Sequence, residues 1–516
     1  MAGVRCVLFV SVTTKGRSVA ICTIFQAIFG ALSWKTSFEN IFKIMAEILT
    51  PDICVIGAGS AGLSVAAAAA AFGVPVVLIE KNKMGGDGLN TGCVPSKALL
   101  AAAKRAAAIQ NSAAFGVAAQ FASVDFAKVH AHVQRTIAAI APNASAERLT
   151  GFGVRVIKGH AAFKDRRTVM VGDIEIRARR FVIATGSAPA VPPIAGLGDG
   201  PYFTNETIFS LTALPKHLIV IGAGSTGLEL AQAFRRLGSN VTVLEAARPL
   251  AKDDPECAAV VVTQLEREGV VIRSGVKVAA VSCAVCTVKV TLDGGETIDG
   301  THLLVAAGRK AATEGLNLES AGIRHDSTGI AVNKKLKTRN GGVYAIGDAA
   351  AGQLQFTHAA NYHADLVIRN ALFRLPVRVN NDVIPWVTYT DPELAQTGLS
   401  EAEARKRGLK IRIIRWPYHD NDRAQTERET RGHIKVVTNT KGKILGATII
   451  GAQAGELMSM WSLAIAQGLN IRALAGIVMP YPTLSEIGKR AAIDYFTPSL
   501  TSPWVRRIIS WLRIFG

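Results

Sequence analysis

The sequence predicts an α/β protein with three kinds of domain along the chain. Two stretches, 53–72 and 218–237, each contain a short apolar strand, a turn of closely spaced glycines and a helix. After about residue 380 the pattern changes to short alternating strands with helices between them. Repeated strand, turn and helix units are typical of doubly wound parallel sheets, whereas the last region is typical of an α+β sheet domain.

The composition predicts a compact protein. Hydrophobic residues make up 49% of the 516 residues and charged residues 19%, which excludes disorder over most of the chain. The net charge of +19 suits anionic cofactors, an anionic membrane or nucleic acid. Because we find no recognised nucleic-acid module, we expect no specific nucleic-acid binding. Seven scattered cysteines do not form a disulfide framework and favour a reducing, cytoplasmic location.

Residues 1–49 form an extra N-terminal segment. Val19 to Trp34 is an apolar stretch of 16 residues between basic residues. It is shorter than the roughly 20 residues that a membrane helix needs, and the basic residues before it interrupt a standard signal peptide. We favour Met45 as the true start, because the residues after it lead directly into the first strand; a weak membrane anchor is the alternative.

The first glycine turn predicts a dinucleotide site. The strand Ile53 to Ile56 leads into Gly57-Ala-Gly59-Ser-Ala-Gly62, and the next strand ends at Glu80. Glycines in such a turn let the backbone approach a pyrophosphate at the helix N-terminus, and the carboxylate reaches a ribose hydroxyl.

The second glycine turn repeats this arrangement. Leu218 to Ile221 leads into Gly222-Ala-Gly224-Ser-Thr-Gly227, and the following strand ends at Glu245. Two dinucleotide sites in one chain suit hydride transfer from a nicotinamide to a flavin. Glu245 would repel a 2′-phosphate and favours NADH, whereas the nearby Arg248 keeps NADPH open.

The stretch between the two units carries the most specific motif. It reads Met84-Gly-Gly-Asp-Gly88-Leu-Asn-Thr-Gly-Cys93-Val-Pro-Ser-Lys97, and Ile183 to Ser187, Val305 to Arg309 and Ala345 to Asp348 follow it. These motifs, in this order, resemble the flavin-dependent pyridine nucleotide-disulfide oxidoreductases, the family of dihydrolipoamide dehydrogenase and mercuric reductase. The resemblance covers residues from about 50 to 500.

This resemblance implies two Rossmann-like, doubly wound nucleotide-binding domains and a C-terminal α+β dimerisation domain. The implied boundaries are 50–195 and 329–380 for the FAD-binding domain, 196–328 for the NAD(P)-binding domain, 381–495 for the dimerisation domain, and 496–516 for a basic amphipathic tail. The implied cofactors are FAD and NAD(P)H. The cofactor-binding residues would be Gly57, Gly59, Gly62, Glu80, Lys97, Ala161, Thr185, Gly186, Ser187, Gly347, Asp348, His358, Gly222, Gly224, Gly227, Glu245, Val278 and Gly308.

The resemblance also implies catalytic residues and a homodimer. Lys97 would lie beside the flavin and pair with Glu229. The segment that contains Tyr481 and Glu486 would complete the active site of the partner subunit. With Cys93, these four residues form the candidate catalytic set.

The chain departs from the family at the first redox cysteine. Members carry two cysteines separated by four residues, and here Gly88 stands at the first position and Cys93 at the second. Disulfide exchange needs an attacking thiolate and a resolving partner, so the ordinary dithiol relay cannot form. Cys93 begins a helix near Lys97, which favours a thiolate. Charge transfer to flavin, cycling through sulfenic acid and a purely structural thiol are all open, as is an error at codon 88.

A second departure lies at Tyr481, where disulfide reductases of this group have a histidine. Without an imidazole, protonating a thiolate leaving group is harder. Tyrosine there resembles mercuric reductase, yet no cysteine follows Cys286 to hand over the metal ion. We therefore favour transfer of electrons from reduced flavin to a small-molecule acceptor such as a quinone, a dye, oxygen or a metal ion. A true disulfide or mercuric reductase with an erroneous Gly88 and a degenerate flavoprotein are the alternatives.

Three further features carry weaker predictions. Cys283 and Cys286 form a lone CxxC, and we expect no metal site there. His358 either packs structurally or contacts FAD through its backbone. Trp504 to Phe515 is basic and amphipathic, and it either packs against the protein or contacts a membrane surface.

Overall fold

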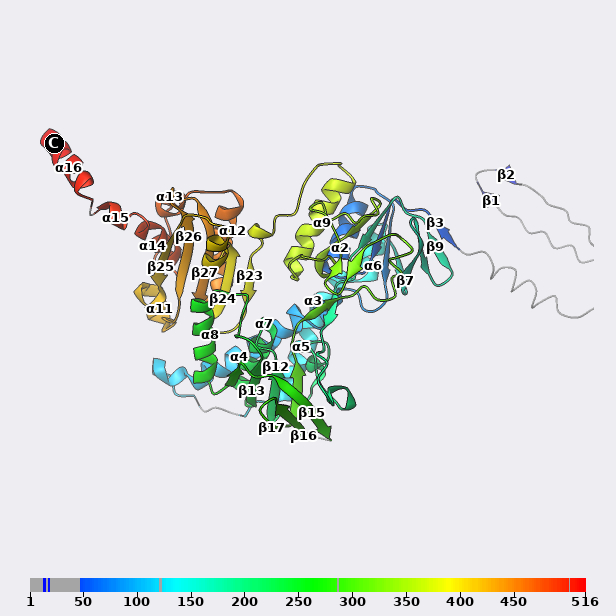
Figure 1. Ribbon diagram of the computed structural model, residues 1–516, viewed down its shortest axis with the longest axis horizontal. Coiled ribbons are helices and arrows are strands. Elements are labelled where there is room, and N and C mark those ends of the chain that lie inside the picture. The colour runs from blue at the N-terminus through cyan, green and yellow to red at the C-terminus, as the bar shows by residue number, and fades with distance from the viewer. Residues whose placement is uncertain (1–12, 15–16, 19–46, 120–122, 285–286, 501) are drawn as a thin grey trace, which may run out of the picture. The chain divides into compact units, whose positions relative to one another are not determined.

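The structure is a computed structural model that describes residues 13–14, 17–18, 47–119, 123–284, 287–500 and 502–516 (Figure 1). It separates into two units, Met1–Glu47 and Ile48–Gly516. In the first unit, β1 (Thr13–Thr14) pairs with β2 (Arg17–Ser18). The apolar stretch Val19 to Trp34 and Met45 lie outside the described residues. The following paragraphs describe the second unit.

The first domain is built on a five-stranded parallel sheet in the order β22, β10, β4, β5, β6. All four residues of β4 (Ile53–Ile56) are buried, as expected for a parallel strand covered on both faces. The glycine turn after β4 leads into α2 (Ser60–Ala71), which packs against α9 (Thr357–Ala371). The other strands are β5 (Val76–Glu80), β6 (Arg155–Lys158), β10 (Arg180–Ile183) and β22 (Val343–Ala345).

A smaller sheet covers one side of this domain, in the order β3, β9, β8, β7. Its edge strand β3 (Ile48–Leu49) pairs with β9 (Ile174–Ile176), so the first domain begins at Ile48, slightly before the predicted boundary at residue 50. The other two strands, β7 (Ala161–Asp165) and β8 (Thr168–Val171), form an antiparallel pair.

The second domain repeats the topology of the first with a four-stranded parallel sheet in the order β14, β13, β12, β18. The turn after β12 (His217–Ile221) leads into α7 (Ser225–Leu237). The other strands are β13 (Asn240–Glu245), β14 (Val271–Ser274) and β18 (His302–Val305). An antiparallel sheet of β15 (Val278–Ala284), β16 (Thr287–Leu292) and β17 (Thr297–Gly300) adjoins it.

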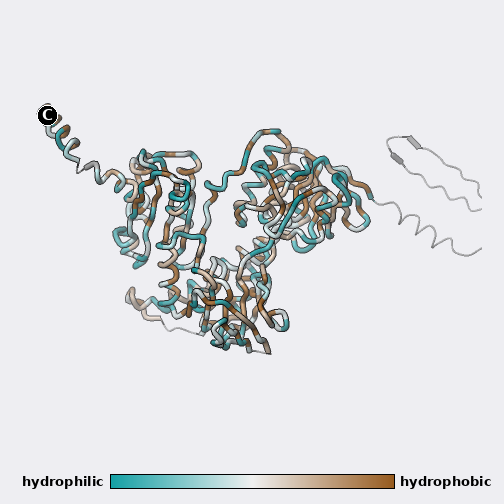
Figure 2. Tube along the Cα trace, viewed as in Figure 1, coloured by the Kyte–Doolittle hydropathy of each residue, from teal (hydrophilic) through white to brown (hydrophobic). Residues whose placement is uncertain are grey.

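The third domain is an antiparallel sheet in the order β23, β24, β27, β26, β25. The helix α12 (Ala454–Ala466) packs on β24 and β27, and Trp461 is fully buried in this core. The strands are β23 (Trp386–Thr388), β24 (Glu393–Gly398), β25 (Ile411–Pro417), β26 (His433–Asn439) and β27 (Ile444–Gly451). Figure 2 marks hydrophobic stretches within all three domains. The predicted α/β class with an α+β third domain is thus confirmed.

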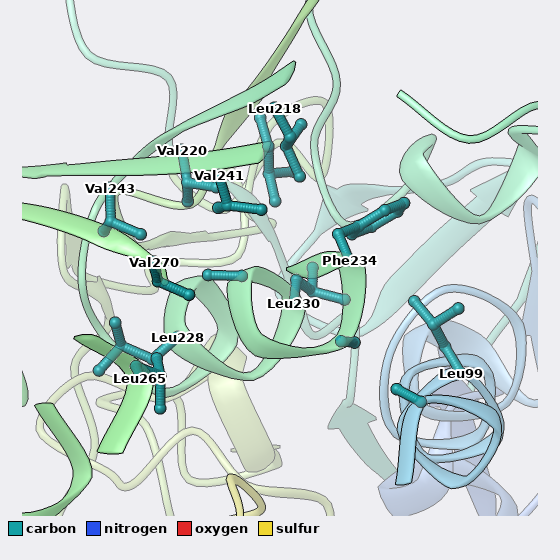
Figure 3. Packing of buried hydrophobic residues seen from close by; sticks show 14 of the residues in the cluster. Leu99, Leu218, Val220, Leu228, Leu230, Phe234, Val241, Val243, Leu265 and Val270 are labelled. Atoms are coloured by element: carbon teal, nitrogen blue, oxygen red, sulfur yellow. The ribbon is translucent and has the colours of Figure 1, made fainter. Parts of the chain in front are cut away.

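One hydrophobic core connects the stretch 84–97, called the redox segment from here on, to the second domain. The helix α4 (Cys93–Gln110) packs against α7, and Figure 3 shows Leu99 of α4 close to Leu230 and Phe234 of α7. On the other side of α7, Val220 and its neighbours in the parallel sheet complete this core. The packing of α4 on α7 determines where the polar side chains of both helices meet.

The chain returns to the first domain earlier than predicted. The prediction placed this return at residue 329, on the motif that ends at Asp348. In the structure, β19 (Arg309–Ala311) already pairs with β11 (Ser187–Pro189). Leu316 and Ile323 are buried in the same core as the strands of the first domain. The apolar residues of this stretch therefore belong to the first domain, although no motif marks them.

The remaining elements are further helices, turns and two short strands. They are α3 (Gly86–Asn90), α5 (Phe126–Ile140), α6 (Ala146–Gly151), α8 (Pro255–Arg267), α10 (Glu401–Lys406), α11 (Asp422–Glu427), α13 (Ile471–Gly476), α14 (Glu486–Asp494), α15 (Thr497–Leu500), α16 (Pro503–Leu512), β20 (His325–Asp326), β21 (Gly329–Ile330) and the 3₁₀ turns η1 (Ser112–Phe115), η2 (Ala141–Ala144), η3 (Leu197–Asp199), η4 (Ile208–Ser210), η5 (Gly347–Ala349), η6 (Asn381–Val383), η7 (Tyr418–Asp420) and η8 (Arg513–Phe515). Among the described residues, no helix is both long and apolar enough to span a bilayer.

Candidate active site

A cavity of about 1340 Å³ lies where the first domain meets α4, α7 and the start of the third domain. Its volume exceeds the usual range of about 300 to 1,000 Å³ for drug-sized ligands, so it has room for a dinucleotide. The glycine turn after β4, the redox segment, the N-terminus of α9 and the loop before β23 all contribute to its wall.

The two glycine turns have the same backbone geometry. Gly57 has a φ of +103° and Gly222 a φ of +108°, a region that L side chains rarely adopt. A Cβ atom at Gly57 would lie 2.5 Å from the Ala184 carbonyl oxygen, and one at Gly222 would lie 2.5 Å from the Ala306 oxygen. Only glycine fits at either position, and in both domains the turn brings the helix N-terminus to the end of the central strand.

The acidic residue of each unit is held in the same way. Glu80 accepts hydrogen bonds from the Ala58 N–H at 2.6 Å and the Asn82 N–H at 2.7 Å. Glu245 accepts from the Ala223 N–H at 2.7 Å and the Ala247 N–H at 2.9 Å. Each carboxylate is therefore positioned at the C-terminal end of its strand, beside the glycine turn, where a ribose hydroxyl would be recognised.

The Arg248 guanidinium, near Glu245, is hydrogen-bonded to backbone carbonyl groups. Its Nη2 donates to the carbonyl oxygens of Ala251 and Asp253, both at 3.1 Å. The guanidinium is occupied within its own loop, which weakens the case for recognition of a 2′-phosphate by this residue.

A polar network crosses the base of the cavity. Asp348, in η5, accepts from the Ser187 hydroxyl at 2.5 Å, and burial raises the pKa of its carboxyl group. Arg309 donates to the Ser187 hydroxyl at 2.7 Å and lies 3.1 Å from an Asp87 oxygen. Asp87 was not among the predicted site residues, although its carboxylate lies in the redox segment itself.

The expected ion pair between α4 and α7 is present. Lys97 Nζ donates to Glu229 Oε2 at 2.8 Å, and the Glu229 side chain is only 6% exposed. The second Glu229 oxygen accepts from the Tyr389 N–H at 2.9 Å, and Lys97 Nζ lies 4.3 Å from the centre of the Tyr389 ring. Tyr389 was missed because it comes from a distant loop, and no motif in the sequence connects it to Lys97.

Cys93 lies at the meeting point of two helix N-termini. It is the first residue of α4, and its Sγ is 3.5 Å from the hydroxyl oxygen of Thr357, the first residue of α9. The thiol is exposed, and the four described cysteines, 54, 93, 257 and 283, are all free. The Cys93 sulfur therefore contacts a hydroxyl group.

The backbone at Gly88 would accept a side chain. A Cβ atom there would have the Thr357 hydroxyl oxygen as its nearest neighbour, at 3.4 Å, which is ordinary van der Waals distance. Neither crowding nor an unusual φ requires glycine at this position. Gly88 is therefore not explained by the fold around it.

Tyr481 and Glu486 lie in the third domain, outside the wall of this cavity. The Tyr481 side chain is 70% exposed, and its hydroxyl donates to Asp422 at 2.9 Å, an interaction that raises its pKa. Glu486 begins α14. Within one subunit, these two candidates are not brought to Cys93.

Two histidines near the cavity have structural partners. His358 Nε2 lies 2.6 Å from the Pro385 oxygen, and its ring stacks on Phe356. His363 is fully buried, accepts from the Gly347 N–H at 3.2 Å, and burial lowers its pKa to about 4. A neutral His363 thus supports the turn that carries Asp348, and sequence analysis did not identify it.

The structure brings together most of the predicted site residues and leaves the others elsewhere. Those that line the cavity are Gly57, Gly59, Glu80, Cys93, Lys97, Ala161, Thr185, Gly186, Ser187, Glu229, Gly347, Asp348 and His358. Those outside its wall are Gly62, Gly222, Gly224, Gly227, Glu245, Val278, Gly308, Tyr481 and Glu486. Cys283 lies in β15 and Cys286 is outside the described residues; among the described residues we find no cluster that could hold a metal ion.

The cavity fits FAD on physical grounds. A Cβ atom at Gly59 would meet nothing closer than the Gly86 Cα at 3.9 Å, so the space beside the first turn is open. The helix α2 begins at this turn with no side-chain cap, which leaves its N-terminal N–H groups available for a pyrophosphate. Glu80 and Asp348 both line this same cavity.

Family comparisons agree with this geometry. The pyridine nucleotide-disulphide oxidoreductase family matches residues 51–364, and its dimerisation domain matches residues 384–492. A mercuric reductase of Lysinibacillus sphaericus is 34% identical over 90% of this chain and 86% of its own length. A dihydrolipoyl dehydrogenase of Thermus scotoductus is 37% identical over 85% of this chain and 95% of its own length.

Solved structures show the same architecture. LpdA from Mycobacterium tuberculosis superposes with a TM-score of 0.80 at 27% identity and covers 87% of this chain and 99% of its own. The HOCl-induced flavoprotein disulfide reductase RclA from Escherichia coli gives a TM-score of 0.77 at 28% identity, with 86% of this chain and 99% of its own covered.

Proposed function

Because the chain belongs to the pyridine nucleotide-disulphide oxidoreductase family, and is an FAD- and NAD(P)H-dependent oxidoreductase on that ground, we propose that it reduces a small-molecule acceptor without a dithiol relay. When bound, FAD supplies the two-electron chemistry that connects a reduced nicotinamide to the acceptor. The substrate class that we propose is a directly reducible compound such as a quinone, a dye, oxygen or a metal ion.

The observation that carries this proposal is the environment of Cys93. A relay needs a second thiol that can close a disulfide with Cys93. Position 88 is glycine, and the group that contacts the Cys93 sulfur is the hydroxyl of Thr357. A lone thiol beside a hydroxyl group cannot store an electron pair as a dithiol.

The residues around the cavity then have binding and positioning roles. Glu80 and Asp348 would hold the ribose and ribityl hydroxyls of FAD, and the N-terminus of α2 would face the pyrophosphate. Lys97, held by Glu229, would place a positive charge beside the flavin ring. We also propose NADH as the preferred donor, because Glu245 stands at the ribose position and Arg248 is engaged by its own loop.

The acceptor side supports the same proposal. The Tyr481 hydroxyl donates a hydrogen bond to Asp422, and its raised pKa makes it a weaker acid than a free phenol. This residue would therefore be poorly suited to protonate a thiolate leaving group. A quinone or metal acceptor needs no such leaving group to be protonated.

The test is an anaerobic titration of the FAD-loaded protein with NADH, monitored by the visible flavin spectrum. The gene is first sequenced again to verify codon 88. Bleaching that is complete at about one equivalent per FAD is expected, because flavin would be the only redox centre. Uptake of two equivalents with a long-wavelength thiolate-to-flavin band would overturn the proposal, since Cys93 would then have found another partner.

Gly88→Cys is the matched variant for this titration. The structure leaves room for the new Cβ atom, so the variant should fold and should regain a partner for Cys93. We expect it to take up about two equivalents, and Cys93→Ser in the same background should return it to one. A wild-type protein that binds FAD but is not reduced by NADH at all would instead indicate a degenerate flavoprotein.

A further inference from the structure

The C-terminal helix α16 and the turn η8 after it carry an unusual surface. They follow the residues that match the dimerisation domain, which end at residue 492. Trp504, Ile508, Trp511, Leu512 and Phe515 recur at the spacing of one helix face. We call these five residues the apolar stripe.

The apolar stripe is not covered by the protein. Trp504 is 71% exposed, Trp511 60% and Phe515 72%. No residue of α16 or η8 is buried. An apolar helix face of this kind is normally buried against a partner, and the structure places none of its large side chains in a core.

The polar side of the helix carries one sign of charge. Arg506 and Arg513 lie opposite the apolar stripe, and Arg507 flanks it. No acidic residue follows Asp494, and the whole chain has a net charge of +19. The tail is therefore complementary to an anionic surface.

We propose that α16 docks the protein on the surface of an anionic lipid bilayer. Tryptophan and phenylalanine on one face with arginine on the other is the arrangement of helices that lie in the plane of a membrane interface. The apolar stripe would enter the headgroup region and the arginines would meet the lipid phosphates. This site is independent of the redox chemistry proposed above.

A second copy of the chain fits the tail less well than a membrane. Two copies of α16 paired through the apolar stripe would leave Arg506 and Arg513 of each copy on the far side of the helix, with no acidic residue of the tail to meet them. Tryptophan is enriched where one end of the side chain is in an apolar environment and the other end is hydrated, as in the headgroup region of a bilayer.

The experiment is flotation of the FAD-loaded protein with phosphatidylcholine vesicles, with and without phosphatidylglycerol. Wild type should float with the anionic vesicles, with a blue shift of its tryptophan fluorescence. A Trp504→Ala/Trp511→Ala variant should lose at least about tenfold in vesicle affinity. Arg506→Gln/Arg507→Gln/Arg513→Gln should lose roughly a hundredfold, since each arginine contributes about 1 kcal/mol near an anionic surface.

A charge-matched control separates docking by the tail from attraction of the whole basic protein. Arg267→Gln/Arg324→Gln/Arg339→Gln removes the same charge at exposed positions of the body and should still bind. The proposal is overturned if wild type does not float, or if this control loses as much affinity as the tail variant. It is also overturned if the tryptophan variant changes the oligomeric state instead of vesicle binding, because a second copy would then cover the stripe. Flavin content, unchanged in all variants, shows that they are folded.

Discussion

We expect one acidic residue at the end of each strand that follows a glycine-turn helix to decide which nucleotide its domain accepts. Glu80 and Glu245 are each held by two backbone N–H groups, which fix each carboxylate at the end of its strand, where we propose that it meets a ribose. A fixed negative charge at this point accepts from a 2′-hydroxyl and repels a 2′-phosphate.

Glu245→Gln should therefore shift the donor preference toward NADPH. Removing the charge relieves the repulsion, and we expect the ratio of kcat/KM for NADPH over NADH to rise about tenfold, a change of about 1.4 kcal/mol. Steady-state kinetics with a dye acceptor measures this ratio. The equivalent change in the first domain, Glu80→Gln, should weaken FAD retention and leave the ratio unchanged; equal shifts in both variants would contradict the assignment.

The site residues that belong to motifs could be predicted from the sequence. The residues that reach the site only through tertiary contacts could not. Lys97 and Glu229 could be paired because both lie at fixed places in recognised segments. Tyr389 and Thr357 touch this pair and Cys93, respectively, but the chain distances are large and neither residue type is distinctive. Their contacts depend on how α4, α9 and the third domain pack, which no local pattern encodes.

Among the elements, α8 connects the second domain to the third. Asp254 caps this helix and receives a 2.8 Å hydrogen bond from Lys435 of β26, whose side chain is only 5% exposed. Glu256, in the first turn, accepts from Arg415 at 2.9 Å and from Lys435 at 3.2 Å. Glu401 of α10 completes the cluster at 2.9 Å from Lys435. The junction is thus a charged network between two domains.

This junction should weaken in acid. Hydrogen bonds from Arg415, and then from Lys435, lower the pKa of Glu256 to about 2. A carboxyl group whose pKa is lowered in the folded state stabilises the protein at pH values above its unfolded-state pKa of about 4.3. This stabilisation is lost as the pH falls toward the folded-state pKa.

The variant Glu256→Gln checks this expectation by urea unfolding across pH. It should be less stable than wild type near neutral pH, and the difference should shrink between about pH 4.3 and pH 2. Glu266→Gln, at an exposed position of the same helix, should match wild type throughout. A difference that stays constant down to pH 2 would show that charge at Glu256 is not what joins the two domains.

The elements themselves were largely predictable. The glycine turns and the buried strands before them were located correctly, because the hydrophobic period, the turn residues and the apolar runs agree there. The return to the first domain at Arg309 was not, since β19 is only three residues long and joins its partner β11 through tertiary contacts. Short strands paired over long sequence distances carry little local signal.

The whole molecule is a homodimer, and its third domain matches the dimerisation domain of the family. Tyr481 is 70% exposed, in the segment Pro480 to Glu486 that the family resemblance assigns to the partner's active site, and Val478, two residues before this segment, is 94% exposed. Exposed apolar side chains beside a dimerisation sheet are expected to be covered by the second subunit.

We expect Val478→Asp to weaken the dimer by tenfold or more, because a buried valine contributes about 1.5 to 3 kcal/mol. Sedimentation velocity over a concentration series measures this change. Val191→Asp, at an exposed position of the first domain, is the matched control and should remain dimeric. A Val478→Asp protein that is as dimeric as wild type would place this segment outside the interface.

A dimer also carries two copies of α16. A single myristoyl chain gives only weak and reversible attachment to a bilayer, and stable anchoring takes a second signal. We expect one copy of the ten-residue helix α16 to attach reversibly in the same way. Once the first helix is bound, the second helix is held at a high effective concentration near the bilayer. The pair therefore binds with an avidity that neither helix has alone. Recruitment to lipid would then follow the monomer–dimer equilibrium, and a protein diluted below its dimer dissociation constant would leave the membrane even with both tails intact.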